Sequence, residues 1–83
     1  MLEIKIHKHP SGGFIVNLPE DTPFRVLDII NNLAVWKNSS SIPETTEYEF
    51  SSAIFNRDID VFHHWFEKVI QCICTMDVII EQI

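Results

Sequence analysis

The final third of the chain combines an amphipathic helix with an apolar strand, and this pair constrains the fold more than any other feature. Six apolar residues recur at three- and four-residue spacing, which places them on one helical face: Ile59, Phe62, Phe66, Val69, Ile70 and Ile73. The segment 76–83 follows as a short apolar strand. Such a strand belongs in a sheet, so the pattern predicts an α+β domain with Phe66 and Ile70 in its core.

The first part of the chain predicts a hairpin and a helix. Apolar and polar side chains alternate over 2–18, and the turn residues 10–13 interrupt them, as in two strands joined by a tight connection. Asp21-Thr22-Pro23 then supplies a side-chain oxygen that can cap free amides and a proline suited to a first helical turn. We therefore expect a helix to start there, with its apolar face on Val26 and Ile30.

The remaining segments complete the expected order. The stretch 37–47 is rich in serine, threonine and proline and predicts a surface loop. Alternation over 48–54 predicts a third strand, and Asn56 is the expected N-cap of a helix over 57–73. The order is strand, strand, helix, strand, helix, strand in one domain, 1–83, with both helices on one face of the sheet.

Over residues 1–50 the chain resembles the β-grasp (ubiquitin-like) superfold. The features that carry the resemblance are the hairpin from Met1 to Leu18, the helix that begins at Asp21-Thr22, and Ile42-Pro43 ahead of a strand. The resemblance implies that the last strand lies parallel to the first, at the centre of the sheet. A ferredoxin-like arrangement is the alternative.

The chain departs from ubiquitin in two respects. The helix over 57–73 is much longer than the corresponding connection in ubiquitin. The chain ends in Glu81-Gln82-Ile83 rather than in two glycines. Conjugation or sulfur carriage is therefore not implied.

Composition limits the classes of partner. Hydrophobic residues make up 46% of the 83 residues and charged residues 22%, as in a globular protein, and the formal net charge is −6. A negative chain does not favour direct binding to nucleic acid or to an anionic membrane, whereas it permits a basic protein partner. The residues 1–6 lack the apolar stretch of a signal peptide, so we expect a cytoplasmic protein, in the host cytoplasm if it is phage-encoded.

The histidines and cysteines do not form a recognised metal or catalytic motif. His7 and His9 lie two apart on a strand and would need Cys72, Cys74 or His63 to complete a site, but Cys72 and Cys74 lack the spacing of zinc ligands. A nucleophilic cysteine would need a base and an orienting group, and no glycine-rich phosphate loop occurs. We expect two free thiols, no metal, no cofactor and no enzymatic activity.

The carboxylates are better organised than the histidines. If the helices cover one sheet face, the opposite face carries five acidic residues: Glu3, Glu47, Glu49, Asp77 and Glu81. This pattern predicts either an acidic docking surface or a face kept soluble by charge. Ile15 and Trp65 are the expected apolar contacts of a docking surface. Trp36 and Trp65 both fall outside the apolar helix faces, so each is either packed between elements or exposed to a partner.

These features favour a small non-catalytic protein that binds a partner and inhibits or regulates it by covering its surface. In size and charge the chain is similar to immunity proteins, antitoxins and phage anti-defence proteins such as anti-CRISPRs. The alternative is a β-grasp structural or adaptor subunit of a larger assembly. A metal-binding protein or an enzyme is the third reading. A homodimer is compatible with all of these.

Overall fold

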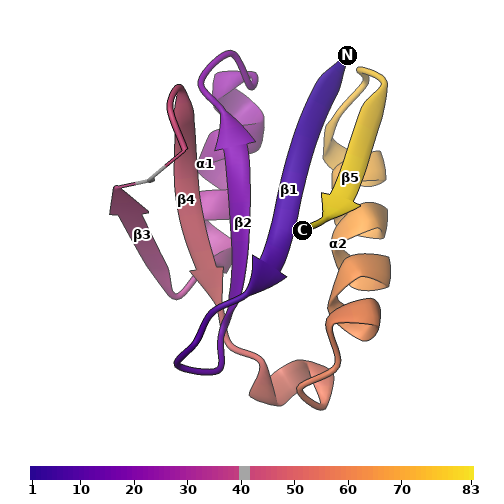
Figure 1. The fold of residues 1–83 in the computed structure, drawn as a ribbon. Helices are drawn as coiled ribbons and strands as arrows, with labels where there is room; N and C mark the ends of the chain where they lie inside the picture. The colour runs from indigo at the N-terminus through magenta and orange to yellow at the C-terminus, as the bar shows by residue number, and fades with distance from the viewer. Residues whose placement is uncertain (40–41) are drawn as a thin grey trace.

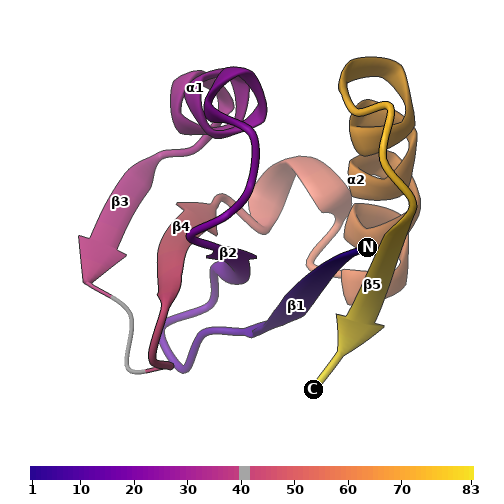
Figure 2. The same cartoon turned by 90° about the horizontal axis from the view of Figure 1, so that it is seen from above.

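Five strands form one mixed sheet, and two helices pack against the same face of it (Figures 1 and 2). The computed structural model describes residues 1–39 and 42–83. The elements are β1 (Leu2–Lys8), β2 (Phe14–Pro19), α1 (Phe24–Leu33), β3 (Trp36–Ser39), β4 (Thr45–Phe50), the 3₁₀ helix η1 (Ala53–Phe55), α2 (Ile59–Ile73) and β5 (Val78–Gln82). The expected two-layer α+β class is confirmed.

The strand order is β3-β4-β2-β1-β5. β1 pairs in parallel with β5, with Leu2 opposite Val78, and the other three pairs are antiparallel. The expected parallel pairing of the first and last strands is therefore confirmed, but the central position expected for the last strand is wrong. β2 is the central strand because β4 pairs with it directly, and β5 lies outside β1 at the edge of the sheet, next to α2 (Figure 2).

The segment expected to be a loop holds a strand. β3 (Trp36–Ser39) pairs antiparallel with β4, and β4 starts at Thr45 rather than at Tyr48. Residues 40 and 41 of that expected loop lie outside the described part of the chain. Sequence reasoning missed β3 because a short, polar edge strand shows no apolar alternation. The strand expected over 48–54 ends at Phe50, and Ile54, an apolar residue of the expected alternation, is instead exposed in η1.

Both helices start later than expected. α1 begins at Phe24 directly after Pro23, and no side chain caps it. α2 begins at Ile59, and its cap is Asp58, whose Oδ1 accepts a hydrogen bond from the backbone N–H of Asp60 at 2.9 Å. Asn56, the expected cap, instead adopts a left-handed conformation with φ of 54° at the end of η1.

The core lies between the sheet and the helices. Alternate residues of β1 and β2 point toward the helices and are buried: Leu2, Ile4, Ile6, Phe14, Val16 and Leu18. Phe62, Phe66 and Ile70 of α2 pack against them, so the predicted burial of Phe66 and Ile70 is confirmed. Phe14 and Phe62 stack with ring centroids 4.9 Å apart. Because this core uses one face of the sheet only, the other face is left uncovered.

Candidate functional site

The uncovered face of the sheet presents two cross-strand rows of side chains. Residues directly opposite one another in neighbouring strands share a face, so the register assigns each row. The first row runs Trp36, Glu49, Ile15, His7, and the second runs Asn38, Glu47, Asn17, Lys5, Glu81. Glu3 lies on the same face, opposite Ile79 of β5. We call this surface the open face.

Four of the five carboxylates expected on the open face lie there. Glu3 and Glu81 are exposed, while Glu47 and Glu49 are half-buried. Lys5 Nζ donates a hydrogen bond to Glu81 Oε2 at 2.8 Å. That bond raises the pKa of Lys5 above its ordinary value, with smaller contributions from the charges of Glu81 and Glu3. Glu81 is thus neutralised within the domain, whereas no ion pair among the described residues engages Glu47 or Glu49.

Glu49 packs closely against the hairpin. A Cβ atom placed on Gly13 would lie 2.8 Å from Glu49 Oε2, so the absence of a side chain at Gly13 makes room for this carboxylate. Glu49 also lines an open hollow together with Arg57 and the residues of the hairpin turn. These contacts hold Glu49 toward one end of the open face, near the turn.

Ile15 does not supply the apolar contact expected of it. Its side chain is 0% exposed on the central strand, between His7 of β1 and Glu49 of β4. The neighbouring side chains of the same row cover it because β2 has a strand on each side. Ile15 therefore supports the open face from beneath and offers no area for a partner to bury.

The two tryptophans occupy opposite environments. Trp65 is half-buried and packs in the aromatic cluster, with ring centroids 5.1 Å from Phe55 and 5.9 Å from Phe50. Trp65 is therefore a packing residue, which corrects its expected role as an exposed contact. Trp36 is 62% exposed at the start of edge strand β3, opposite Glu49. Sequence reasoning left Trp36 undecided because it depends on a strand whose sequence gives no clear signal.

Asp77 does not belong to the open face. It precedes β5, in the connection from α2, and lines a hollow between that helix and the strand. Its backbone carbonyl accepts a hydrogen bond from the Leu2 N–H at 2.9 Å. The fifth expected carboxylate therefore lies just outside the strands that form the open face.

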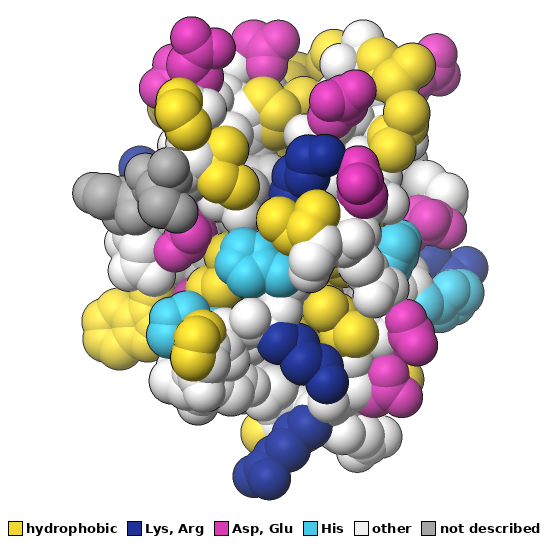
Figure 3. Space-filling model, viewed as in Figure 1, with side chains coloured by type: hydrophobic (Ala, Val, Ile, Leu, Met, Phe, Trp, Pro, Cys, Tyr) yellow, Lys and Arg dark blue, Asp and Glu magenta, His cyan; other side chains and the backbone are white. Residues whose placement is uncertain are grey.

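The open face is chemically mixed. Figure 3 shows acidic, basic and histidine side chains interspersed on this face, with acidic side chains most frequent toward its upper end. The expected acidic surface is therefore a set of separate carboxylates. Glu47 and Glu49, beside Trp36 and Asn38, form its most coherent part. We call these four residues the β3–β4 patch.

Neither a metal site nor a membrane segment is found in the described part of the chain. No three His, Cys, Asp or Glu side chains among residues 1–39 and 42–83 lie close enough to hold a metal ion. Cys72 and Cys74 are free thiols. No helix within these residues is long and apolar enough to cross a bilayer. The expectation that the protein binds no metal and is not an enzyme stays a prediction.

Comparison with known proteins finds no matching family model, no matching curated protein and no matching solved structure.

Proposed function

We propose that this protein is a non-catalytic binding protein that inhibits or regulates a basic partner protein by covering its surface. The β3–β4 patch is the proposed centre of contact. The function is of the kind performed by immunity proteins, antitoxins and anti-CRISPRs, for which a small acidic domain suffices.

The observation that carries the proposal is the exposure of Trp36 on the open face, directly beside Glu49. Tryptophan is enriched at the energetic centres of protein interfaces because it buries a large area and loses little conformational entropy. Leu33 and Val35, which precede it in the chain, are also exposed.

The carboxylates define the chemistry of the partner. Glu47 and Glu49 lie two residues apart on β4 and point to the same face. The strand neighbours of Glu47 are the uncharged Asn38 and Asn17, so a lysine or arginine from a partner would meet no competing cation there. Charges of this kind mainly raise the association rate, while the buried aromatic side chain sets the dissociation rate.

The test is a kinetic one. The protein is used to capture its partner, and association is then measured at low and at physiological salt for the wild type and for a Glu47→Lys/Glu49→Lys variant. We expect the variant to associate about tenfold more slowly at low salt, with a smaller difference at physiological salt. Trp36→Ala is expected to raise the dissociation rate instead.

A charge-matched control separates the patch from the net charge. Glu20 and Asp21 are exposed in the turn between β2 and α1. Glu20→Lys/Asp21→Lys changes the net charge by the same amount and should leave association within about twofold of wild type. If the Glu47→Lys/Glu49→Lys variant also associates at the wild-type rate in low salt, the open face is merely solvated and the proposal is wrong.

The captured partner also separates the two classes of function. A single nuclease, toxin or defence protein whose activity falls on binding supports an inhibitor. A stable assembly of several subunits would instead indicate the structural or adaptor role.

A further inference from the structure

The β3–β4 patch places an indole ring between two carboxylates. Trp36 lies directly opposite Glu49 in the antiparallel ladder. Glu47 lies two residues before Glu49 on the same face of β4, which makes it a diagonal neighbour of Trp36. Opposite residues have Cβ atoms about 4.5–5.5 Å apart and diagonal residues about 7–8 Å, which long and aromatic side chains can span. A side chain that lies on the indole can therefore also reach a carboxylate.

The indole of Trp36 is available to a ligand. The residue is 62% exposed because it lies on edge strand β3, which has β4 as its only neighbour in the sheet. Trp65 packs against other rings, whereas Trp36 has no aromatic contact in the described part of the chain. The face of an indole ring is the negative end of its quadrupole and attracts cations.

The two carboxylates differ in their surroundings. Glu49 leans toward the hairpin, where its Oε2 atom would lie 2.8 Å from a Cβ atom on Gly13. It also shares the hollow at the hairpin turn with Arg57. Glu47 has uncharged strand neighbours on both sides, and no ion pair in the described ranges engages it. Glu47 is therefore the carboxylate more available to a cation from outside the domain.

We propose that the β3–β4 patch binds an arginine side chain of the partner, stacked on the indole of Trp36 and paired with the carboxylate of Glu47. This inference rests on the proposed function and names the side chain by which the partner is recognised. Stacking uses the flat face of the guanidinium and leaves the N–H donors in its plane free for a carboxylate beside the ring. Glu49 adds a second negative charge next to the indole.

The indole makes the patch selective among cations. The ammonium group of lysine is compact and strongly hydrated, so contact with an aromatic face costs it more water than it costs the weakly hydrated guanidinium. Lysine also cannot stack as a flat group while donating a pair of parallel hydrogen bonds to one carboxylate. The carboxylates alone would accept either cation, whereas the ring and the carboxylates together favour arginine.

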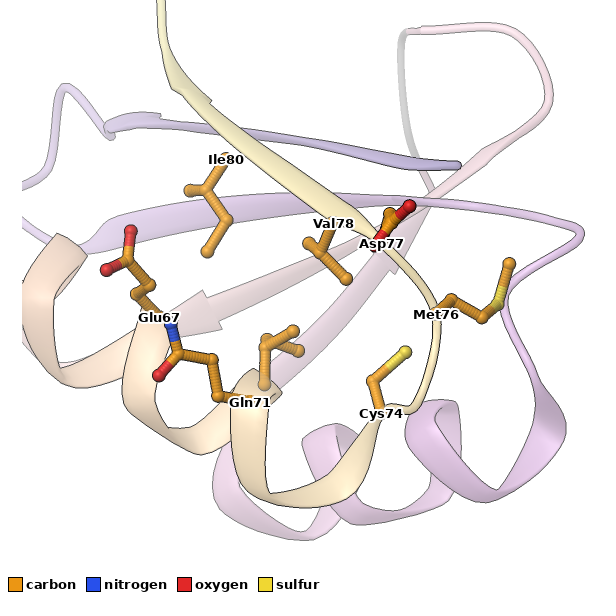
Figure 4. Close-up of a pocket in the computed structure, with 8 residues that line it drawn as sticks. Glu67, Gln71, Cys74, Met76, Asp77, Val78 and Ile80 are labelled. Carbon is orange, nitrogen blue, oxygen red and sulfur yellow. The ribbon is translucent and has the colours of Figure 1, made fainter.

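The hollow between α2 and β5 provides an internal comparison. Figure 4 shows Glu67 on α2 and Asp77 beside β5, on either side of the apolar Val78 and Ile80. Two carboxylates line this hollow, as at the patch, but no aromatic side chain lines it. A cation attracted by charge alone would approach both places. An arginine that also requires an indole would select the patch.

Charge disfavours a second copy of the chain as the source of this arginine. The chain has two arginines, Arg25 and Arg57. Arg57 lies in the hollow that Glu49 of the same molecule lines. Arg25, in the first turn of α1, follows the exposed Glu20 and Asp21 closely in the chain, so docking through it would bring like charges toward the patch. An arginine in a basic surface of another protein meets no such opposition.

The test is an NMR titration of the full chain at low salt with three matched peptides. These are acetyl-Gly-Arg-Gly-amide and its lysine and citrulline counterparts, of which citrulline keeps the shape of arginine without the charge. We expect the arginine peptide to shift the Trp36 indole N–H signal and to show upfield shifts of its own δ-CH₂ protons, because these lie over the ring. The lysine peptide should bind at least about threefold more weakly and the citrulline peptide at least about tenfold more weakly.

Three single substitutions separate the ring from the charge. Trp36→Leu keeps an apolar side chain and identifies the Trp36 indole signal by its loss, and it should bring the arginine and lysine peptides to within about twofold of each other. Glu47→Gln should weaken binding of the arginine peptide about fivefold. Glu67→Gln removes the same charge from the comparison hollow and should leave binding within about twofold of wild type.

Four results would overturn the inference. They are no saturable shift at Trp36 with the arginine peptide, equal binding of the arginine and lysine peptides, the largest shifts around Glu67 and Asp77, and a concentration-dependent dimer that buries Trp36 without peptide. Equal binding at the patch would leave the proposed function standing, because an acidic docking surface does not require a preference for arginine. Selective arginine binding, with partner association unchanged in Glu47→Lys/Glu49→Lys, would retain the arginine site and reject the proposed function.

Discussion

Two phenylalanines show how strongly a residue's position decides its energetic weight. Phe66 is fully buried in the aromatic cluster, and Phe24 is 81% exposed at the start of α1. Phe66→Ala removes a buried ring and leaves a cavity, so it should lower the free energy of unfolding by about 3–5 kcal/mol. Phe24→Ala, the matched control, should change it by less than about 0.5 kcal/mol. Urea unfolding measures both, and similar values for the two variants would contradict the assigned core.

Tyr48 makes stability sensitive to alkaline pH. Burial raises the pKa of Tyr48 above its ordinary value of 10.0, so the folded protein holds the phenolic proton more tightly than the unfolded chain does. The resulting stability is fully present below about pH 10 and is lost as the pH rises through the folded pKa. Tyr48→Phe should therefore lose less stability above about pH 10 than the wild type does.

The chain has a single tyrosine, so this titration can be followed directly. Ultraviolet absorption of tyrosinate reports the ionisation of Tyr48 in the folded protein, and thermal melts across the same range report stability. A tyrosinate transition at the pKa of a free tyrosine, with parallel melting curves for the wild type and Tyr48→Phe, would contradict the expected effect of burial.

At the scale of the element, the start of α2 depends on one side chain. Asp58 caps the first turn, where its carboxylate accepts a hydrogen bond from the Asp60 N–H. The carboxylate also lies at the positive end of the helix dipole, which stabilises its negative charge. Asp58→Ala should cost about 0.5–2 kcal/mol. Asp28→Ala removes the same charge from an exposed interior position of α1 and should be close to neutral or slightly stabilising. Equal thermal shifts for the two variants would show that the cap is unimportant.

The strands at the two edges were the elements least accessible to sequence reasoning. Alternation of apolar and polar residues indicates that one face of a strand is buried. β3 shows no such alternation, because the polar residues Lys37 and Asn38 directly follow Trp36. The apolar character of β5 suggested a central strand, yet β5 lies at an edge and shields its apolar side chains beneath α2. An edge strand covered by a helix and a central strand therefore have similar compositions.

At the scale of the whole molecule, stability should not depend on metal. The aromatic and aliphatic core is continuous from the hairpin to α2, and no cluster of three metal-binding side chains occurs in the described ranges. We expect substoichiometric zinc in the purified protein and the same melting temperature with and without a chelator. A one-to-one zinc content, or a melt lowered by the chelator, would contradict this expectation.

The architecture of the whole molecule also explains why the open face is available for binding. Two helices cover one face of a five-stranded sheet and leave the other face accessible (Figure 2). The open face offers side chains, namely Trp36 with Glu47 and Glu49.

The sequence by itself determined the hairpin, the two helices, the buried face of α2 and the outward direction of Glu47 and Glu49. These follow from periodicity, because the spacing of apolar residues reflects which side of an element is buried. Only the tertiary structure decided the strand order, the edge position of β5, the burial of Ile15 and the opposite environments of Trp36 and Trp65. Those properties depend on which strands become neighbours, and strand pairing joins residues far apart in the chain that no local pattern encodes.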